Sequence, residues 1–136
     1  MITPHVLIAE DEQNARFTLS LILRKAGYSV TAVENGRAAL ECLHDSLTSG
    51  KPIDLLLTDL RMSGLTGIEL LDAIKSLNIS LPVVVITGYG TKEMLHRLSG
   101  MGIYSYLEKP FNAFELIRTV NQALALTPQD TADQRV

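Results

Sequence analysis

The sequence predicts one α/β domain built on a parallel sheet that helices cover on both faces. Five short apolar or β-branched runs alternate with five amphipathic segments along the chain. The connections between them are short, which favours parallel strands joined by right-handed crossovers. Three runs, at residues 5–9, 53–58 and 82–87, are largely continuous in apolar character, as strands buried on both faces should be. Ligands of such sheets bind beyond the carboxyl ends of the strands.

The first half of the chain predicts three strands and two helices. Apolar residues recur at helical spacing after Asn14, and Gly27 ends that helix. Asn35-Gly36 predicts a turn before the second helix, and Ser49-Gly50 predicts its end. The expected strands are residues 5–9, 28–33 and 53–58, and the expected helices are residues 14–26 and 38–47.

The second half predicts two strands and three helices. Leu65-Thr66-Gly67 opens the third helix, and the run PVVVIT is the most apolar strand of the chain. The expected strands are residues 82–87 and 103–107. The third helix should open at residues 65–67 and carry Ile68, Leu71 and Ile74, and the other two helices are expected at residues 91–99 and 113–126. The last helix should bury one face, made of Phe114, Ile117, Val120 and Leu124.

Composition bounds the class of protein. The 136 residues are enough for one domain, expected over residues 1–126, with residues 127–136 as a polar tail or the start of a linker. The net charge is −3 without a basic stripe, so nucleic-acid binding is not expected. No signal peptide follows Met1, and no apolar run approaches the roughly 20 residues of a membrane span. With one cysteine, Cys42, the chain fits a reducing compartment, so we expect a cytoplasmic domain.

Polar residues collect where the predicted strands end. The first strand runs directly into Glu10-Asp11-Glu12, and the third ends at Asp59. The fourth ends at Thr87, and the fifth is followed by Lys109. Carboxylates a few ångströms apart repel by several kcal/mol at an effective dielectric near 20, so folding favours a cation between them. Oxygen ligands of this kind suit Mg²⁺.

This set of residues predicts phosphoryl chemistry. A metal-bound carboxylate, a hydroxyl donor and a lysine can clamp a phosphoryl group, because its transfer depends on positioning and charge neutralisation. Asp59 is the expected nucleophile, forming an acyl phosphate, and Glu10 and Asp11 are the expected metal ligands. The simpler alternatives for Glu10 and Asp11 are solvated acids of a loop, or a capping role at the positive amino terminus of the first helix. Glu12 is expected in the first helical turn rather than at the metal.

Between about residues 4 and 125 the chain resembles a response-regulator receiver domain. The resemblance rests on Glu10-Asp11, on Asp59 within LLLTDLRMSGLTG, on Thr87 within VVVITGYG and on Lys109 within YLEKPF. It implies a flavodoxin-like fold with five helices and strand order 2-1-3-4-5. It also implies that a sensor histidine kinase or a phosphotransfer protein supplies the phosphoryl group to Asp59.

The same resemblance assigns roles to the site residues. Asp11, Asp59 and the backbone carbonyl of Arg61 would bind Mg²⁺, with Glu10 acting directly or through water. Thr87 and Lys109 would each contact a phosphoryl oxygen. Tyr106 would turn inward as Thr87 moves, and the surface of helix 4, strand 5 and helix 5 would report the change. The resemblance also predicts a cis Lys109–Pro110 bond.

Some positions depart from the common pattern of the family. Glu10 replaces an aspartate and is one methylene longer, which favours metal contact through water. Ser63 replaces a proline, and Ile103 replaces a small residue. Arg61 and Tyr89 occupy variable positions beside the site, where we expect their bulk and charge to tune the lifetime of the acyl phosphate.

Other functions were weighed against a phosphorylation-activated switch. A flavin- or nucleotide-binding protein would need donor-rich loops, whereas acids follow the first strand and no GxGxxG motif occurs there. A Mg²⁺-dependent aspartyl phosphatase would need a second acid two residues after the nucleophile, where Arg61 stands. A receiver-like module that binds partners without phosphorylation also stays open. The chain is not expected to be an enzyme beyond its own phosphorylation and dephosphorylation, and its output would come from a downstream protein or from a carboxyl-terminal output domain.

Overall fold

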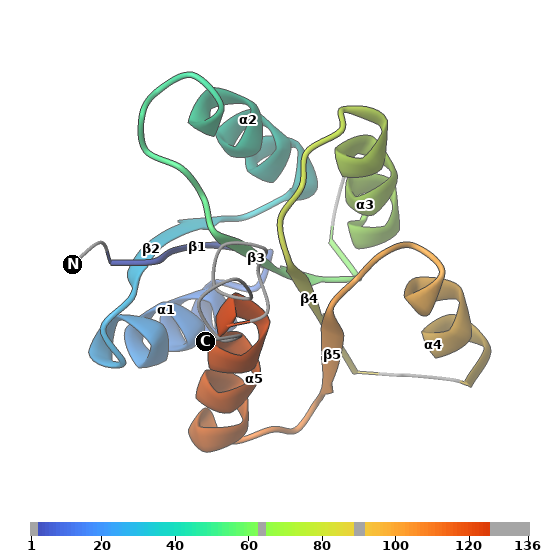
Figure 1. Ribbon diagram of the computed structural model, residues 1–136. Coiled ribbons are helices and arrows are strands. Elements are labelled where there is room, and N and C mark those ends of the chain that lie inside the picture. Colours follow the sequence, from blue (N-terminus) through green and yellow to red (C-terminus); the bar gives the residue numbers. More distant parts are fainter. Residues whose placement is uncertain (1–2, 63–64, 89–91, 126–136) are drawn as a thin grey trace, which may run out of the picture.

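The computed structural model describes residues 3–62, 65–88 and 92–125. They form a parallel sheet in the order β2-β1-β3-β4-β5, which confirms the predicted fold class and strand order. Helices pack on both of its faces (Figure 1). The strands are β1 (His5–Ala9), β2 (Ser29–Val33), β3 (Leu55–Asp59), β4 (Val83–Thr87) and β5 (Ser105–Glu108). The helices are α1 (Gln13–Lys25), α2 (Gly36–Ser46), α3 (Gly67–Ser76), α4 (Lys92–Ser99) and α5 (Ala113–Ala125).

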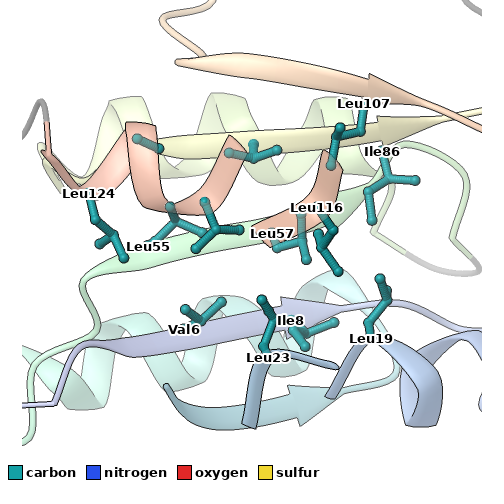
Figure 2. Packing of buried hydrophobic residues seen from close by; sticks show 13 residues of the cluster. Val6, Ile8, Leu19, Leu23, Leu55, Leu57, Ile86, Leu107, Leu116 and Leu124 are labelled. Atoms are coloured by element: carbon teal, nitrogen blue, oxygen red, sulfur yellow. The ribbon is translucent and has the colours of Figure 1, made fainter. Parts of the chain in front are cut away.

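Two hydrophobic layers lie on the sheet, one on each face. Alternate residues of a strand contribute to different layers, because successive side chains of a strand point to opposite sides. The first layer packs Val6, Leu55 and Leu57 against α1 and α5 (Figure 2). The second layer packs Leu7 and Leu56 against α2, α3 and α4. Burying one such side chain stabilises the fold by roughly 1.5–3 kcal/mol. Four of the five residues of β1 and all of β3 are buried, so these two strands lie at the centre of the domain.

Local capping fixes where the helices begin. The Glu12 side chain accepts hydrogen bonds from the backbone N–H of Asn14 and Ala15, which starts α1. Thr66 and Glu69 form a capping box at the start of α3. Asn35 accepts from the backbone N–H of Ala38, so Asn35-Gly36 is a helix start rather than the simple turn expected from the sequence.

Two details of the predicted helices are wrong. α2 ends at Ser46 with Leu47 as its cap, three residues before the Ser49-Gly50 signal, and the Leu47 side chain is exposed. The buried face of α5 centres on Leu116 and Val120 instead of Phe114, which is 69% exposed. Phe114 stands in the first helical turn, where its ring lies beneath the guanidinium of Arg118, 5.7 Å from ring centroid to Cζ.

None of the helices in the described part of the chain combines the length and apolar character that crossing a membrane requires. The tail at 127–136 lies outside the described residues, as do Ser63 and Tyr89, so the expectations for them stay predictions.

Candidate functional site

The register of the sheet brings the predicted site residues to one edge. Asp59 closes β3 opposite Ile86, and Thr87 closes β4 opposite Glu108. Glu10 directly follows β1, and its backbone N–H donates to the Val33 carbonyl of β2 at 3.0 Å. Parallel strands end at the same edge, so four segments that are distant in sequence meet here.

The three carboxylates of residues 10–12, the acidic loop after β1, lie in different environments. Glu10 is 1% exposed, and its Oε2 accepts the backbone N–H of Glu12 at 3.1 Å. Asp11 is exposed at the mouth of the site. Glu12 is the N-cap of α1, one residue before the first helical turn in which the sequence placed it, and both of its carboxylate oxygens accept backbone N–H groups of that turn. The cap at α1 is therefore Glu12, and the alternative capping role for Glu10 is wrong.

Both carboxylate oxygens of Asp59 accept hydrogen bonds. Oδ1 accepts the backbone N–H of Arg61 at 3.1 Å, and Oδ2 accepts from Nζ of Lys109 at 3.2 Å. Asp59 is 7% exposed. Its backbone is held by a close approach to Gly67, where an added Cβ would lie 2.5 Å from the Asp59 carbonyl oxygen. A glycine at the start of α3 therefore sets how Asp59 is presented.

Lys109 connects the two buried acids. Its Nζ lies 3.8 Å from Oε1 of Glu10 in addition to the contact with Asp59. Partial burial on its own would lower the pKa of Lys109, but the negative charges of Asp59, Glu10 and Asp11 outweigh burial and raise it. The backbone N–H of Lys109 donates to the Thr87 carbonyl at 2.9 Å, and the Lys109–Pro110 bond is cis, as the resemblance implied.

The two predicted switch residues differ in exposure. Thr87 is 3% exposed at the end of β4, and Tyr106 is 40% exposed on β5. Tyr106 pairs in register with Val85, two residues before Thr87. Tyr106 belongs to neither of the two hydrophobic layers of the sheet.

The donor set fits a hard divalent cation such as Mg²⁺. Among the described residues, Oε1 of Glu10 is buried and has no hydrogen-bond partner. Burial, followed by the repulsion of Asp59, raises the pKa of Glu10 to about 7. A buried, unsatisfied carboxylate oxygen costs free energy that a cation would recover. No three His, Cys, Asp or Glu side chains in the described ranges converge as a metal cage, so further oxygens would have to come from the backbone or from water, which Mg²⁺ accepts.

One residue beside the site was not predicted from the sequence. Nη1 of Arg16 donates to the carbonyl oxygen of Glu10 at 2.8 Å and to that of Asp11 at 3.4 Å. Arg16 follows the capping Glu12 by one helical turn. That spacing is a signal the sequence offers, because a long side chain one turn after a cap can reach back to the preceding loop.

Comparison with known proteins gives a consistent family. The model of the response regulator receiver domain family matches residues 6–121. Sporulation initiation phosphotransferase F from Bacillus subtilis (strain 168) is 31% identical over 126 residues, which are 93% of this chain and 98% of the relative. DNA-binding transcriptional regulator NtrC from Escherichia coli (strain K12) is 33% identical over 120 residues, which are 88% of this chain but 24% of the relative.

A solved response regulator receiver protein from Pseudomonas putida superposes with a TM-score of 0.80 at 28% identity, over 90% of this chain and 98% of that one. The chain thus spans about a quarter of the NtrC relative and nearly all of the sporulation protein. The family match, the relatives and the fold agree with the cluster of acids and lysine at the sheet edge, and the chain belongs to the receiver domain family of two-component response regulators.

Proposed function

We propose that the chain is a phosphorylation-activated signalling switch in which Asp59 accepts a phosphoryl group in a Mg²⁺-dependent reaction. The observation that carries the proposal is the position of the Asp59 carboxylate at the carboxyl edge of the sheet, 3.2 Å from Nζ of Lys109, which also lies 3.8 Å from Glu10. A carboxylate held by a lysine at a strand end can attack phosphorus while its neighbours offset the charge that accumulates.

The donor would be a phosphohistidine on a sensor histidine kinase or on a phosphotransfer protein. An Asp59 carboxylate oxygen forms a bond to phosphorus as the bond from phosphorus to the imidazole nitrogen breaks, and that nitrogen keeps the bonding electron pair. Lys109 then balances charge on the phosphoryl oxygens, and the Thr87 hydroxyl donates a hydrogen bond to one of them. The product is an acyl phosphate on Asp59.

The ligands for Mg²⁺ would be the carboxylates of Glu10, Asp11 and Asp59 with the backbone carbonyl of Arg61. When bound, Mg²⁺ supplies positive charge to the phosphoryl oxygens and to the acids around them. Glu10 supports this assignment best, since its Oε1 is buried without a hydrogen bond. The hydrogen bond from the backbone N–H of Arg61 to Asp59 supports the assignment of the Arg61 carbonyl, because it keeps the backbone of Arg61 next to the Asp59 carboxylate.

The conformational response would run from Thr87 to Tyr106. Phosphorylation would favour a state in which Thr87 shifts toward the phosphoryl group and the Tyr106 ring turns inward. The surface of α4, β5 and α5 would then present a different face to a downstream protein or to an output domain. The exposed ring of Tyr106 on β5 supports this reading, because it has room to change its position.

The relatives suggest two settings for such a switch. NtrC is named as a DNA-binding transcriptional regulator and is about four times longer than the matched segment. The sporulation protein is named as a phosphotransferase and matches over nearly its whole length. Either an output domain or a next phosphoryl carrier would therefore suit this chain, in the cytoplasm where such partners act.

Two other functions are less well supported. An aspartyl phosphatase would need a carboxyl group for acid–base catalysis at the position where Arg61 stands. A module that works without phosphorylation would not need Lys109 held within 3.2 Å of Asp59. We therefore assign no turnover activity beyond the domain's own phosphorylation and dephosphorylation.

Intact-mass spectrometry after incubation with acetyl phosphate tests the proposal. The wild-type protein should gain one phosphoryl group with Mg²⁺ and none in chelator, and Asp59→Asn should gain none. Asp54→Asn is the matched control, because Asp54 precedes the same strand at the opposite edge, where it accepts the backbone N–H of His5. Undiminished labelling of Asp59→Asn would refute the assignment.

A further inference from the structure

The guanidinium of Arg16 donates hydrogen bonds to two backbone carbonyls of the acidic loop. Nη1 lies 2.8 Å from the Glu10 oxygen and 3.4 Å from the Asp11 oxygen. Both carbonyls belong to residues assigned above as magnesium ligands. Hydrogen bonds with a charged donor are stronger than neutral ones, so this contact restrains the loop backbone more than a hydrogen bond between two backbone groups would.

The rest of the loop is tied down through other groups. The N–H of Glu10 donates to Val33, and the N–H of Glu12 donates to Oε2 of Glu10. The N–H of Arg16 itself donates to the Glu12 carbonyl within α1. The helix therefore places the Arg16 side chain, and the side chain in turn fixes the direction of the Glu10 and Asp11 carbonyls.

Arg16 also affects the charge of the site. A carbonyl oxygen adds negative potential to a region that already holds Glu10, Asp11 and Asp59. The guanidinium turns two such oxygens toward itself and brings a positive charge close by, which eases the repulsion among the acids but does not by itself attract a cation. Its contacts described here are with the backbone, and Oε1 of Glu10 keeps no hydrogen bond, 3.8 Å from Nζ of Lys109. The support that Arg16 gives to cation binding therefore comes from the orientation of the loop.

We propose that Arg16 is a positioning residue for magnesium binding, which it supports by fixing the backbone of Glu10 and Asp11. The inference rests on the proposed function, since it assumes that these residues bind Mg²⁺. Residues that orient metal ligands typically contribute 10- to 100-fold to metal affinity. A loss of that size is therefore expected when the guanidinium is removed.

Arg24 provides a matched control on the same helix. Its Nη2 donates to the Val30 carbonyl at 3.2 Å, so it makes the same kind of contact two turns further along α1. Val30 lies on β2 and is not part of the site. Substituting Arg24 removes an equal charge and an equal type of hydrogen bond from α1 without touching the acidic loop.

The experiment measures the Mg²⁺ dissociation constant by calorimetry for the wild type, Arg16→Gln, Arg16→Lys and Arg24→Gln. Arg16→Gln should raise the Mg²⁺ Kd about tenfold or more, and Arg24→Gln should change it less than about twofold. Arg16→Lys should fall between, because it keeps the positive charge but loses the planar guanidinium whose Nη1 reaches both carbonyls. Labelling by acetyl phosphate should show the same order in half-saturating Mg²⁺, with its maximal rate largely recovered at saturating Mg²⁺.

A purely structural role would lower the melting temperature and the maximal labelling rate without moving the Mg²⁺ Kd, and that result would overturn the inference. Equal Kd values for Arg16→Gln and Arg24→Gln would overturn it too, while leaving the proposed function intact. A wild-type protein that binds no Mg²⁺ would instead refute the proposed function, and the inference with it. If Arg16→Gln does not fold, the comparison of Arg16→Lys with Arg24→Gln decides.

Discussion

Nζ of Lys109 lies 3.2 Å from Oδ2 of Asp59, although 50 positions separate the two residues in the sequence. The contact exists because β3 and β5 run parallel on either side of β4 and end at one edge. It places a fixed positive charge beside the expected phosphoacceptor. The electrostatic balance of the metal-free site depends on this pair and on Glu10 next to it.

Removing the Lys109 charge should destabilise the metal-free protein. In Lys109→Gln, Glu10 and Asp59 would face each other without a cation, so their repulsion would act against folding. Because Lys109 is partly exposed, we expect a modest loss of about 1 kcal/mol in the free energy of unfolding. Urea denaturation at neutral pH in chelator and low salt measures it. Lys75→Gln, at an exposed position of α3, is the control, and equal losses for both variants would contradict the account.

The stability of the metal-free protein should fall as pH rises toward neutrality. Burial and then the negative charge of Asp59 raise the pKa of Glu10 to about 7 from 4.5, so the folded state binds more protons than the unfolded state between these values. The free energy of unfolding therefore decreases with pH in that window, by up to roughly 3 kcal/mol from this group. The backbone N–H of Glu12 and the charge of Lys109 oppose the rise in the pKa of Glu10.

Urea denaturation between pH 4.5 and 7.5 in chelator checks this slope against Glu10→Gln, in which it should largely vanish. Saturating Mg²⁺ should also flatten it, because the cation favours the ionised carboxylate. A slope that is the same in the wild type and in Glu10→Gln would show that other groups cause it.

Gly67→Ala should disturb both stability and phosphorylation. An added Cβ would lie 2.5 Å from the Asp59 carbonyl oxygen and 2.8 Å from Cα of Leu60, so the backbone that presents Asp59 must shift. Overpacking of this kind costs about 1–3 kcal/mol. Gly100→Ala is the control, since its Cβ would meet the Arg97 carbonyl at an ordinary 3.5 Å. Urea denaturation and the rate of labelling measure the two effects, and a Gly67→Ala protein as stable as Gly100→Ala would contradict this reading.

Phosphorylation should protect Tyr106 from solvent. Tyr106 is 40% exposed without phosphorylation, and the proposed switch turns its ring inward. Hydroxyl-radical footprinting should show slower oxidation of Tyr106 after treatment with acetyl phosphate and Mg²⁺, while Phe17, 67% exposed on α1, should react at an unchanged rate. Thr87→Val should remove the protection. If Tyr106 oxidises equally fast in both states of the wild type, the switch assignment fails.

Much of this structure follows from sequence pattern. The runs that become β3 and β4 are so continuously apolar that only a doubly covered strand suits them, and every residue of both is buried. Once parallel strands are inferred, the meeting of Asp59, Thr87 and Lys109 at one edge follows. The strand order itself came from resemblance, because periodicity does not say which strands are neighbours.

The positions of Phe114, Arg16 and Gly67 depend on three-dimensional contacts that the periodicity of the sequence does not predict. Phe114 has the spacing of a buried residue, yet it stands in the first turn of α5 and is exposed beside Arg118. Arg16 stands one turn after the capping Glu12, but that spacing does not say which two backbone carbonyls its guanidinium reaches. The tight approach of Gly67 to the Asp59 backbone is also a property of three-dimensional packing.

Locating the phosphoryl group on the wild-type protein tests the central claim most directly. After labelling with acetyl phosphate and Mg²⁺, borohydride reduces an acyl phosphate to an alcohol, which converts the phosphorylated aspartate to homoserine. Peptide mass spectrometry should find homoserine at position 59 and at no other aspartate. Homoserine at Asp11 or Asp54, or a phosphate that resists reduction because it sits on a hydroxyl side chain, would contradict the account.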